Sequence, residues 1–461
     1  DSSWDGIWDA RCRLDEAGWT IEIVLPFKSL SFDPGSSTWG LNFRRSIPRK
    51  NESIRWNHPV RGDTIYNMKD FGELRGLADL KPVRGLELRP FLAFGYSHRS
   101  KEDHYDEQAG LDLAYRFNPR LTAQLSYKMD FAETEVDSRR INLSRFPLFF
   151  PEKRDFFLEN NSIFTFGGVF RSPVAFHSRR IGLTEAGDPL DILAAAKLSG
   201  SFDGGRFGLI DAHMDEQPGL GSKNLSVGRA VFDLGEESSW GILATNGEPH
   251  AAGNNSLAGI DYSYRNSEFT SAALDFQANF YLMAIEADGV SGNPAAFGSS
   301  LSARNDEWYV YAGAEQVDDQ FDPALGYVRQ DDIHEYDLFV RRRHRPENLN
   351  PPLFPIDSID LEFEGNAVIR LDGSLDSWQW EPGIEMESKS GDEIEFIHFL
   401  HRENLPSPHV MQYGERTGES VTLRAAEYRW SRSALILSSS EHRPVSATIV
   451  LSGGDYYDGE M

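Results

Sequence analysis

Residues 106–131, DEQAGLDLAYRFNPRLTAQLSYKMDF, alternate apolar and polar residues on both sides of a short turn. Because successive side chains of a strand point to opposite faces, each half has one apolar and one polar face. The Asn118-Pro119-Arg120 turn between the halves predicts an antiparallel hairpin. The residues of the apolar parity are Ala109, Leu111, Leu113, Tyr115 and Phe117, then Leu121, Ala123, Leu125, Tyr127, Met129 and Phe131.

The same alternation recurs from about residue 86 to residue 451, in segments separated by turn residues. Strands of roughly 9–11 residues in long antiparallel succession are what a transmembrane β-barrel needs. The sequence therefore predicts an all-β fold, a large antiparallel transmembrane-type barrel with about 16–19 strands present. The chain stops after residues 455–461 without an evident closing strand, so we expect an incomplete barrel whose last strands are missing.

Composition limits the classes of function. The 461 residues carry a formal charge of −26, from 46 Lys and Arg against 72 Asp and Glu. Because phosphate contacts need cations, this balance argues against a nucleic-acid partner. A run of about 18 apolar residues is absent from the sequence, so no transmembrane helix is expected. Hydrophobic residues at 40% and aromatic residues at 12% fit either a barrel with aromatic girdles or a large soluble all-β protein.

Cys12 is the only cysteine of the chain, which excludes an intrachain disulfide and a cysteine-based metal site. The chain opens with Asp1-Ser2-Ser3-Trp4 and has neither an initiating Met nor a signal peptide. We therefore expect a fragment that begins inside a domain, and the missing targeting signal says nothing about location.

Three regions are predicted along the chain. Residues 1–56 carry short alternating strands typical of the C-terminal end of a β-sandwich, and residues 57–85 form a linker. Residues 86–461 form the barrel, interrupted by a long inserted loop at 133–191. A loop of this length is usually functional or folded back on its scaffold, so its aromatic residues are expected to pack, either as a plug inside the lumen or as an anchor against the barrel.

Several stretches carry a family resemblance over nearly the whole chain. They are GWTIEI (18–23) with Pro26-Phe27, WGLNFRR (39–45), RFPLFFPEKR (145–154), SRRIGL (178–183), FDPALGYV (321–328) and YYDG (456–459). In these stretches the chain resembles uncharacterised bacterial outer-membrane β-barrels that carry an N-terminal carbohydrate-binding family-nine-like (DOMON-like) sandwich. The resemblance implies glycan binding by the sandwich, most of which is missing here, and a place in the Gram-negative outer membrane.

Alternation also predicts which side chains line the lumen. If Leu361, Phe363 and Trp380 face lipid, a set of carboxylates faces inward. A wall rich in carboxylates favours cations, and the alternative is an ordinary solvated wall without selectivity. The predicted lumen residues are Glu362, Glu364, Glu381, Glu385, Glu393 and Glu395, accompanied by Asp360 and Arg370. The strand at 225–234 fits only if Arg229 points inward with Val227.

The loop and the tryptophans each have two interpretations. The charged loop residues Arg145, Glu152, Lys153, Arg154 and Glu159 either contact the wall or a ligand, or satisfy one another while the loop phenylalanines pack. Trp4, Trp8, Trp19 and Trp39 form either a sugar-stacking platform or sandwich core. Trp240, Trp308, Trp378, Trp380 and Trp430 are expected in the aromatic girdles.

The search for catalytic motifs is mostly negative. The sequence has no G-x-S-x-G, no P-loop and no H-E-x-x-H, since Leu338 stands where the second His of His334-Glu335 would be. Asp211 and His213 share a parity and could face the lumen together as part of a hydrolase. The acidic residues near Asp318 fit no EF-hand. We expect no catalytic residues, no metal and no cofactor.

The first hypothesis is a non-enzymatic outer-membrane barrel linked to glycan binding or to uptake of solute or saccharide. Its partners would be outer-membrane lipid and an oligosaccharide, the latter implied by the resemblance. The second is a membrane-associated hydrolase acting on glycan or lipid, which would need two carboxylates flanking a cleft. The third is a soluble all-β binding protein. Lipid-facing charge separates them, because a barrel keeps charged residues off one parity in mid-strand.

Overall fold

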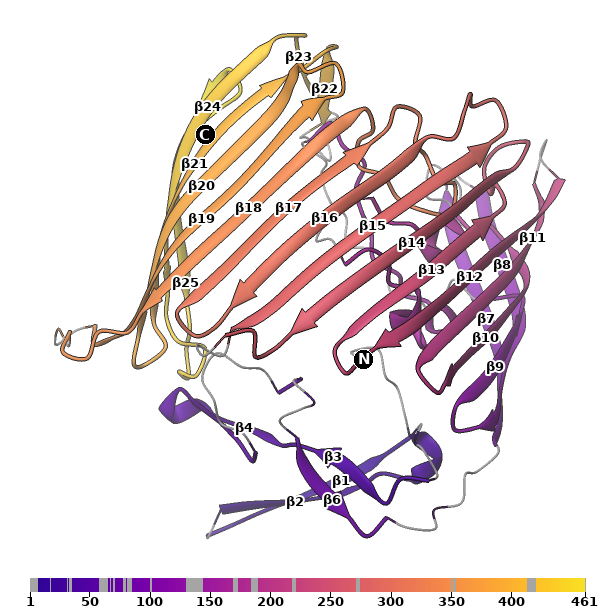
Figure 1. The fold of residues 1–461 in the computed structure, drawn as a ribbon, viewed down its shortest axis with the longest axis horizontal. Helices are drawn as coiled ribbons and strands as arrows, with labels where there is room; N and C mark the ends of the chain where they lie inside the picture. The colour runs from indigo at the N-terminus through magenta and orange to yellow at the C-terminus, as the bar shows by residue number, and fades with distance from the viewer. Residues whose placement is uncertain are drawn as a thin grey trace.

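In a computed structural model of the chain, a large β-barrel stands above a smaller N-terminal segment (Figure 1). The described residues are 7–16, 18–30, 32, 35–57, 65–66, 68, 71–77, 80, 85–99, 102–129, 144–168, 173–183, 190–217, 221–270, 274–349, 351, 354–412 and 420–460. Trp4, Phe131 and loop residues 133–143, 169–172 and 184–189 therefore lie outside the description.

Seventeen antiparallel strands form the wall, and the two-residue β26 completes the ring between β25 and β7. This confirms the predicted fold class, and the number lies within the predicted range. The strands are β7 (Gly85–Arg99), β8 (Glu102–Asn118), β9 (Leu121–Tyr127), β10 (Ile192–Phe202), β11 (Gly205–Gln217), β12 (Gly221–Leu234), β13 (Ser238–Asn246), β14 (Asn255–Asn266), β15 (Asp275–Ala287), β16 (Ala295–Arg304), β17 (Trp308–Val317), β18 (Ile333–His344), β19 (Ile356–Arg370), β20 (Leu375–Ser388), β21 (Glu393–Asn404), β24 (Glu427–Ser438), β25 (Thr448–Tyr456) and β26 (Gly459–Glu460).

The sheet closes into a ring, whereas the sequence predicted that it would lack a closing strand. Tyr457 adopts a left-handed backbone conformation with φ 52°, which turns the chain back on itself. Gly459 then pairs with Tyr456, and Glu460 pairs with Asp455. Alternation could not reveal this strand, because it is only two residues long.

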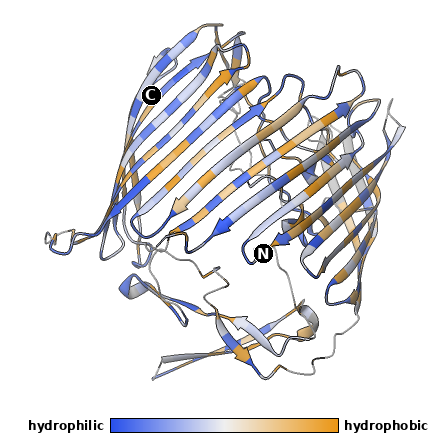
Figure 2. Cartoon of the chain, viewed as in Figure 1, coloured by the Kyte–Doolittle hydropathy of each residue, from blue (hydrophilic) through white to orange (hydrophobic). Residues whose placement is uncertain are grey.

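Hydrophilic and hydrophobic residues alternate along the strands of the wall (Figure 2), and many large apolar side chains of these strands are exposed on the outward face. Leu209, Ile242, Leu282 and Leu361 are exposed on this face, although they are large and apolar. At the rim where β7 begins, Phe232 stacks on Trp240 with ring centroids 4.5 Å apart. Such a band edged by aromatic rings matches the hydrocarbon core and interface of a bilayer. Among the described residues, no helix is long and apolar enough to cross a membrane.

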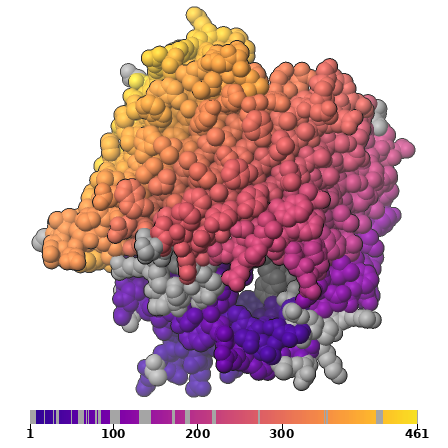
Figure 3. All heavy atoms as spheres, viewed as in Figure 1, coloured from indigo at the N-terminus to yellow at the C-terminus, as the bar shows by residue number. Residues whose placement is uncertain are grey.

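Short paired strands make up the N-terminal segment, which lies against the lower rim of the barrel (Figure 3). β1 (Asp9–Asp15) pairs with β2 (Gly18–Val24), and β4 (Arg44–Ile47) pairs with β5 (Glu52–Arg55). β3 (Thr38–Leu41) pairs with β6 (Gly72–Arg75), which lies within the predicted linker. The division into a sandwich remnant at 1–56 and a linker at 57–85 stays a prediction.

The described part of the inserted loop, residues 144–168 and 173–183, packs against the inner wall, and we call it the plug. It contains the one-turn helix α1 (Asp155–Leu158) and two 3-10 turns, η4 (Asn161–Phe164) and η5 (Ser178–Arg180). Phe157, Phe164 and Ile181 of the plug share one buried core with inward-facing side chains of β10 to β19. Each fully buried side chain of this size contributes about 1.5–3 kcal/mol, so the plug is an integral part of the fold.

Candidate functional site

A buried ion pair fastens the plug to the wall. Arg229 on β12 is 4% exposed and donates to both carboxylate oxygens of Asp261 on β14, at 2.7 and 2.8 Å. The same carboxylate accepts the backbone N–H of Gly167 at 3.0 Å. Arg229 thus points inward beside the buried Val227, which confirms the condition that the sequence set for this strand.

A second anchor joins the plug to β9 and β10. The Lys197 ammonium donates to the backbone carbonyls of Phe156 and of Glu159, the latter at 2.6 Å. The Glu159 carboxylate accepts from the Gln124 side chain on β9. Lys197 therefore satisfies the carbonyls where α1 ends, a place where a helix leaves acceptors unpaired. Glu159, a candidate ligand residue, instead holds the plug to the wall.

A third anchor lies at the opposite rim from the N-terminal segment. Arg145 donates its Nε to Glu403 on β21 at 2.7 Å and pairs with Asp376 on β20. Asp376 is fully buried and also accepts from Arg370 at 2.6 Å. Asp376 lies at a bulge in β20, because Val368 of β19 pairs with Ser377 and Ile369 pairs with Leu375. Because a bulge reverses the parity of one residue, the sequence pattern could not place Asp376 inside the lumen.

The other charged plug residues satisfy one another. The Glu152 carboxylate accepts from Arg154 at 2.7 and 2.9 Å and from the Ser178 hydroxyl at 2.5 Å. Arg154 also donates to the carbonyls of Ile181 and Ser178, at 2.7 and 2.8 Å. The backbone N–H of Lys153 donates to Glu152 at 2.9 Å. These hydrogen bonds join residues 152–154 to residues 178–181 within the plug.

Glu152 is strongly perturbed. Burial by itself raises the pKa of this carboxyl, but the hydrogen bond and charge of Arg154, with the Ser178 hydroxyl, outweigh it. The net result lowers the pKa of Glu152 to about 2, from an ordinary value of 4.5. Because a lowered pKa means that folding favours the ionised form, the carboxylate stabilises the plug at neutral pH by about 3 kcal/mol.

This ionised carboxylate predicts a pH dependence of stability. Its contribution is fully present above about pH 4.5 and is lost as the pH falls towards 2, because the unfolded chain binds the proton first. Substituting Glu152→Gln should remove that contribution, so its loss of stability relative to the parent shrinks as the pH falls. Urea unfolding at several pH values measures this. E236Q, at an exposed turn, is the matched control, and equal pH profiles for E152Q and E236Q would contradict the assignment.

The plug aromatics fall into two groups. Phe156 and Phe157 are buried in the shared core. Phe146 is covered by the guanidinium groups of Arg145 and Arg329, whose central carbons lie 4.5 and 4.2 Å from the ring centroid. Phe149 is partly exposed near the rim and packs on Tyr327, with ring centroids 5.1 Å apart. Packing of the plug and contact with the wall thus occur together.

The other half of the inner wall is ionisable. Asp360 on β19 is buried and accepts from Arg343 on β18 at 2.8 and 3.0 Å. Asp360, Glu362 and Glu385 have carboxylate oxygens within 4.8 Å of one another. This group could hold a cation only in competition with Arg343, which already supplies a positive charge to it.

The remaining predicted lumen carboxylates lie on the same face. In strand register, Glu364 lies opposite Glu381, Glu385 opposite Glu395, and Glu387 opposite Glu393. They are half-buried except Glu393, which is exposed. Asn366 on the same face donates to Glu335 at 2.7 Å and to Asp337 at 2.9 Å. The structure thus brings all six predicted glutamates to one strip of wall, on β19 to β21.

Two predicted placements are wrong. Asp211 and His213 share a face, but it is the outward one, because Ile210, Ala212 and Met214 occupy the inward parity against the plug. Asp211 accepts from Ser226 at 2.6 Å on that outer face. Trp430 belongs to no girdle but faces inward, 9% exposed, with its ring stacked on His401. On β11 the plug covers an apolar inward face, so an apolar parity does not by itself mark the side that faces lipid.

The described N-terminal tryptophans have different surroundings. Trp8 and Trp19 are 54% and 51% exposed, and the Arg45 guanidinium lies 5.0 Å from the Trp19 ring centroid. Trp39 packs on Phe27 and Phe32, with ring centroids 5.7 and 5.2 Å away.

Several site residues were missed by the sequence analysis. Lys197 stands alone as a charge in an alanine-rich strand, and Arg341 and Arg343 share a parity with Glu335 and Asp337. Each was visible as a charge on the inward parity, so extending the alternation test to every strand would have found them. Glu403 and Asp376 needed the three-dimensional position of Arg145.

Residues 81–199, about a quarter of the chain, match a family described as a domain of unknown function (DUF5916). No curated protein matches the sequence. Pseudomonas aeruginosa OccK11 (OpdR) is 11% identical over 79% of this chain and 90% of its own, with a TM-score of 0.33. P. aeruginosa OpdL is 11% identical over 81% of this chain and 90% of its own, with a TM-score of 0.34. The P. aeruginosa outer membrane protein opdK is 12% identical over 80% of this chain and 97% of its own, with a TM-score of 0.29. The barrel described above rests on the strand pairing of this chain itself.

Proposed function

We propose that the protein is an outer-membrane channel, in which the plug fills one side of the lumen and a carboxylate-lined passage runs along the other. The outward apolar band with its aromatic edge supports a place in a bilayer. A soluble all-β protein would leave this large apolar surface in water, at high cost.

One observation carries the proposal: the inner wall has two unlike halves. From β10 to β16 the inward side chains are largely apolar and buried under the plug, as Met214, Leu243 and Met283 illustrate. From β18 to β21 they are largely ionisable and half-buried. Half-buried charges on an inner wall need water beside them, since a dry charge would require a partner for every polar atom.

The charge of this passage predicts selectivity for cations. Glu362, Glu385 and Glu395 contribute carboxylates to it, so potassium should pass more readily than chloride. In planar bilayers, E362Q/E385Q/E395Q should lower the potassium-to-chloride permeability ratio roughly twofold or more. Reversal potentials in a KCl gradient measure this ratio.

The matched control is E236Q/E268Q/E286Q, which removes three exposed glutamates outside the passage. It should leave the permeability ratio unchanged, because these charges lie away from the ion path. Equal ratios for both triple variants would contradict a passage along β19 to β21, and absence of conductance in the parent would contradict a channel.

A second proposal is that the N-terminal segment binds a glycan, and the exposed rings of Trp8 and Trp19 support it. Aromatic faces of this kind present an apolar surface to a partner. It remains separate from the channel, because the two tryptophans lie on β2 or just before β1, outside the barrel wall.

A further inference from the structure

Two glutamates lie buried side by side on the inner wall, between the half that the plug covers and the half that lines the passage. Glu315 on β17 and Glu335 on β18 are 8% and 4% exposed. They are direct partners in the register of these two strands, and a hydrogen bond joins the Glu315 side chain to Glu335. Residues directly opposite each other have Cβ atoms about 5 Å apart, so the strand pairing holds the two carboxyl groups together.

Neutral donors from two other strands support the pair. The Tyr281 hydroxyl on β15, itself 6% exposed, donates to Glu315 at 3.1 Å. The Asn366 amide on β19 donates to Glu335 at 2.7 Å and to Asp337 at 2.9 Å. These donors bring no positive charge. A hydrogen bond between the two carboxyl groups therefore needs a proton on one of them, since an ionised carboxylate is only an acceptor.

Two arginines adjoin the pair, and each is already bonded to an aspartate. Arg370 on β19 donates to Asp376 at 2.6 Å. Arg229, which lies beyond Tyr281, donates to Asp261 at 2.7 and 2.8 Å. The uncharged neighbours are Gly298 and Ser300 on β16, Val368 on β19, and Phe166 and Gly167 of the plug, and the other titratable neighbours are Tyr281, Tyr311 and Asp337.

The pair is connected to the plug through Tyr281. The Tyr281 ring lies 6.2 Å from the Phe166 ring, centroid to centroid, and a Cβ built on Gly167 would lie 3.2 Å from it. Tyr281 is therefore packed between the plug and the Glu315 carboxyl group. A change in the charge of the pair acts on a side chain that the plug rests on.

We propose that Glu315 and Glu335 form a proton-binding site, in which the two carboxyl groups hold one proton between them at neutral pH. Two ionised carboxylates buried side by side repel each other strongly, so such a pair keeps a proton that an isolated carboxyl group would release. Loss of this proton at higher pH puts a second negative charge beneath the plug and destabilises the plugged barrel. The site belongs to the wall and the plug, and it does not depend on whether ions pass through the barrel.

Urea unfolding of the full chain in lipid vesicles at several pH values tests this with E315Q, which keeps the size of the side chain but cannot lose a proton. An unfolded glutamate releases its proton at about pH 4.3, whereas the folded pair keeps one, so the parent should lose stability as the pH rises. Relative to E315Q, the unfolding equilibrium constant of the parent should rise by up to about tenfold per pH unit above that value. E315Q should therefore match the parent in acid and be more stable than the parent at neutral pH.

Infrared difference spectroscopy of the folded protein at neutral pH detects the proton directly. The parent pair contributes one carboxylic acid and one carboxylate, so E315Q should lose absorption of the acid carbonyl and keep that of the carboxylate. E286Q removes an exposed glutamate of β15 and is the matched control. It should lose carboxylate absorption and follow the pH profile of the parent.

Three results would overturn the proton-binding site. They are loss of carboxylate rather than acid absorption in E315Q, pH profiles of the parent and E315Q that run parallel, and an E315Q that fails to fold or is less stable than the parent at every pH. The last result counts because a neutral side chain of equal size should relieve the pair, not harm it. Heat-dependent gel mobility shows whether each variant is folded, and a barrel without conductance leaves both measurements intact.

Discussion

Replacing Arg229 by leucine is expected to lower the free energy of unfolding by about 3–5 kcal/mol. The substitution leaves the Asp261 carboxylate inside the barrel with the Gly167 N–H but without its cation. An uncompensated buried charge is costly because it has lost water and gained no partner. Urea unfolding of the chain folded in lipid vesicles measures the change.

R206L is the matched control, because Arg206 forms a longer and half-exposed pair with Asp233, at 3.7 Å. Its loss should cost no more than about 1 kcal/mol. R229L/D261L removes both charges and should recover much of the stability, as replacement of whole buried pairs does. If R229L were as stable as R206L, the pair would not be the anchor described here.

Removing the plug is expected to open the barrel. With residues 133–189 replaced by a short glycine–serine turn, single-channel conductance should rise at least about twofold, since barrels of 16–18 strands enclose a water-filled channel when unplugged. Stability should fall in the same variant, because Met214, Leu225 and Leu257 would meet water instead of the plug phenylalanines. Planar-bilayer recording and thermal unfolding measure the two effects.

A second deletion distinguishes the plug from a general loop effect. The hairpin of β22 (His409–Gln412) and β23 (Ser420–Leu423) lies at the end of the barrel that is opposite the N-terminal segment (Figure 1). Its removal should leave conductance within the spread of the parent. Conductance that stays unchanged on plug deletion, or rises equally with both deletions, would be incompatible with a plug that narrows the lumen.

The sequence alone determined the architecture of the wall. Alternation in residues 106–131 predicts a hairpin, and β8 and β9 pair with Leu113 opposite Leu125, both strands lying in the closed wall. The inward position of Arg229 followed from the same rule. Strand alternation is a local property, with a period of two residues fixed by the backbone, so it can be read without knowing the partner strand.

Alternation failed where a local signal was interrupted. Lys128 adopts a positive φ of 51° after β9, so Met129 leaves the outward parity and is buried in the core shared with the plug. The bulge at Asp376 has the same effect on β20. An interruption of this kind puts the residues on one side of it out of step with those on the other side, and the sequence pattern does not mark where this happens.

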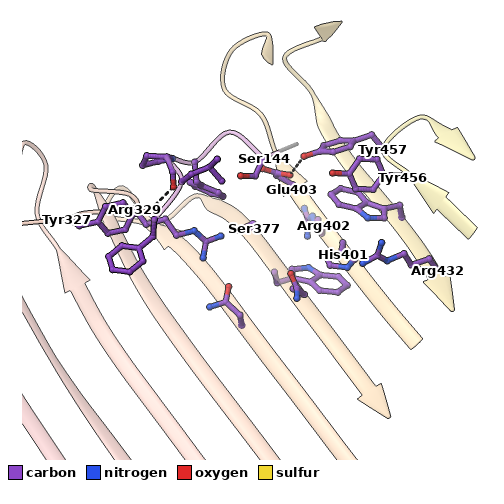
Figure 4. A pocket seen from close by; sticks show the side chains of 18 residues that line it. Ser144, Tyr327, Arg329, Ser377, His401, Arg402, Glu403, Arg432, Tyr456 and Tyr457 are labelled. Atoms are coloured by element: carbon purple, nitrogen blue, oxygen red, sulfur yellow. Dashed lines mark hydrogen bonds between the residues drawn. The ribbon is translucent and has the colours of Figure 1, made fainter. Parts of the chain in front are cut away.

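Only the tertiary structure decided what fills the lumen. The plug packs against β11, whose inward face is apolar, so Asp211 and His213 face outward. On β19 to β21, the inward face carries glutamates. A cavity of about 450 Å³ (Figure 4) likewise brings together Phe146, Arg329, His401 and Arg432, which come from the plug, the loop between β17 and β18, β21 and β24. Contacts between distant segments depend on how the loop packs, and that packing is set by the complementary shape and charge of surfaces that exist only after the wall has formed.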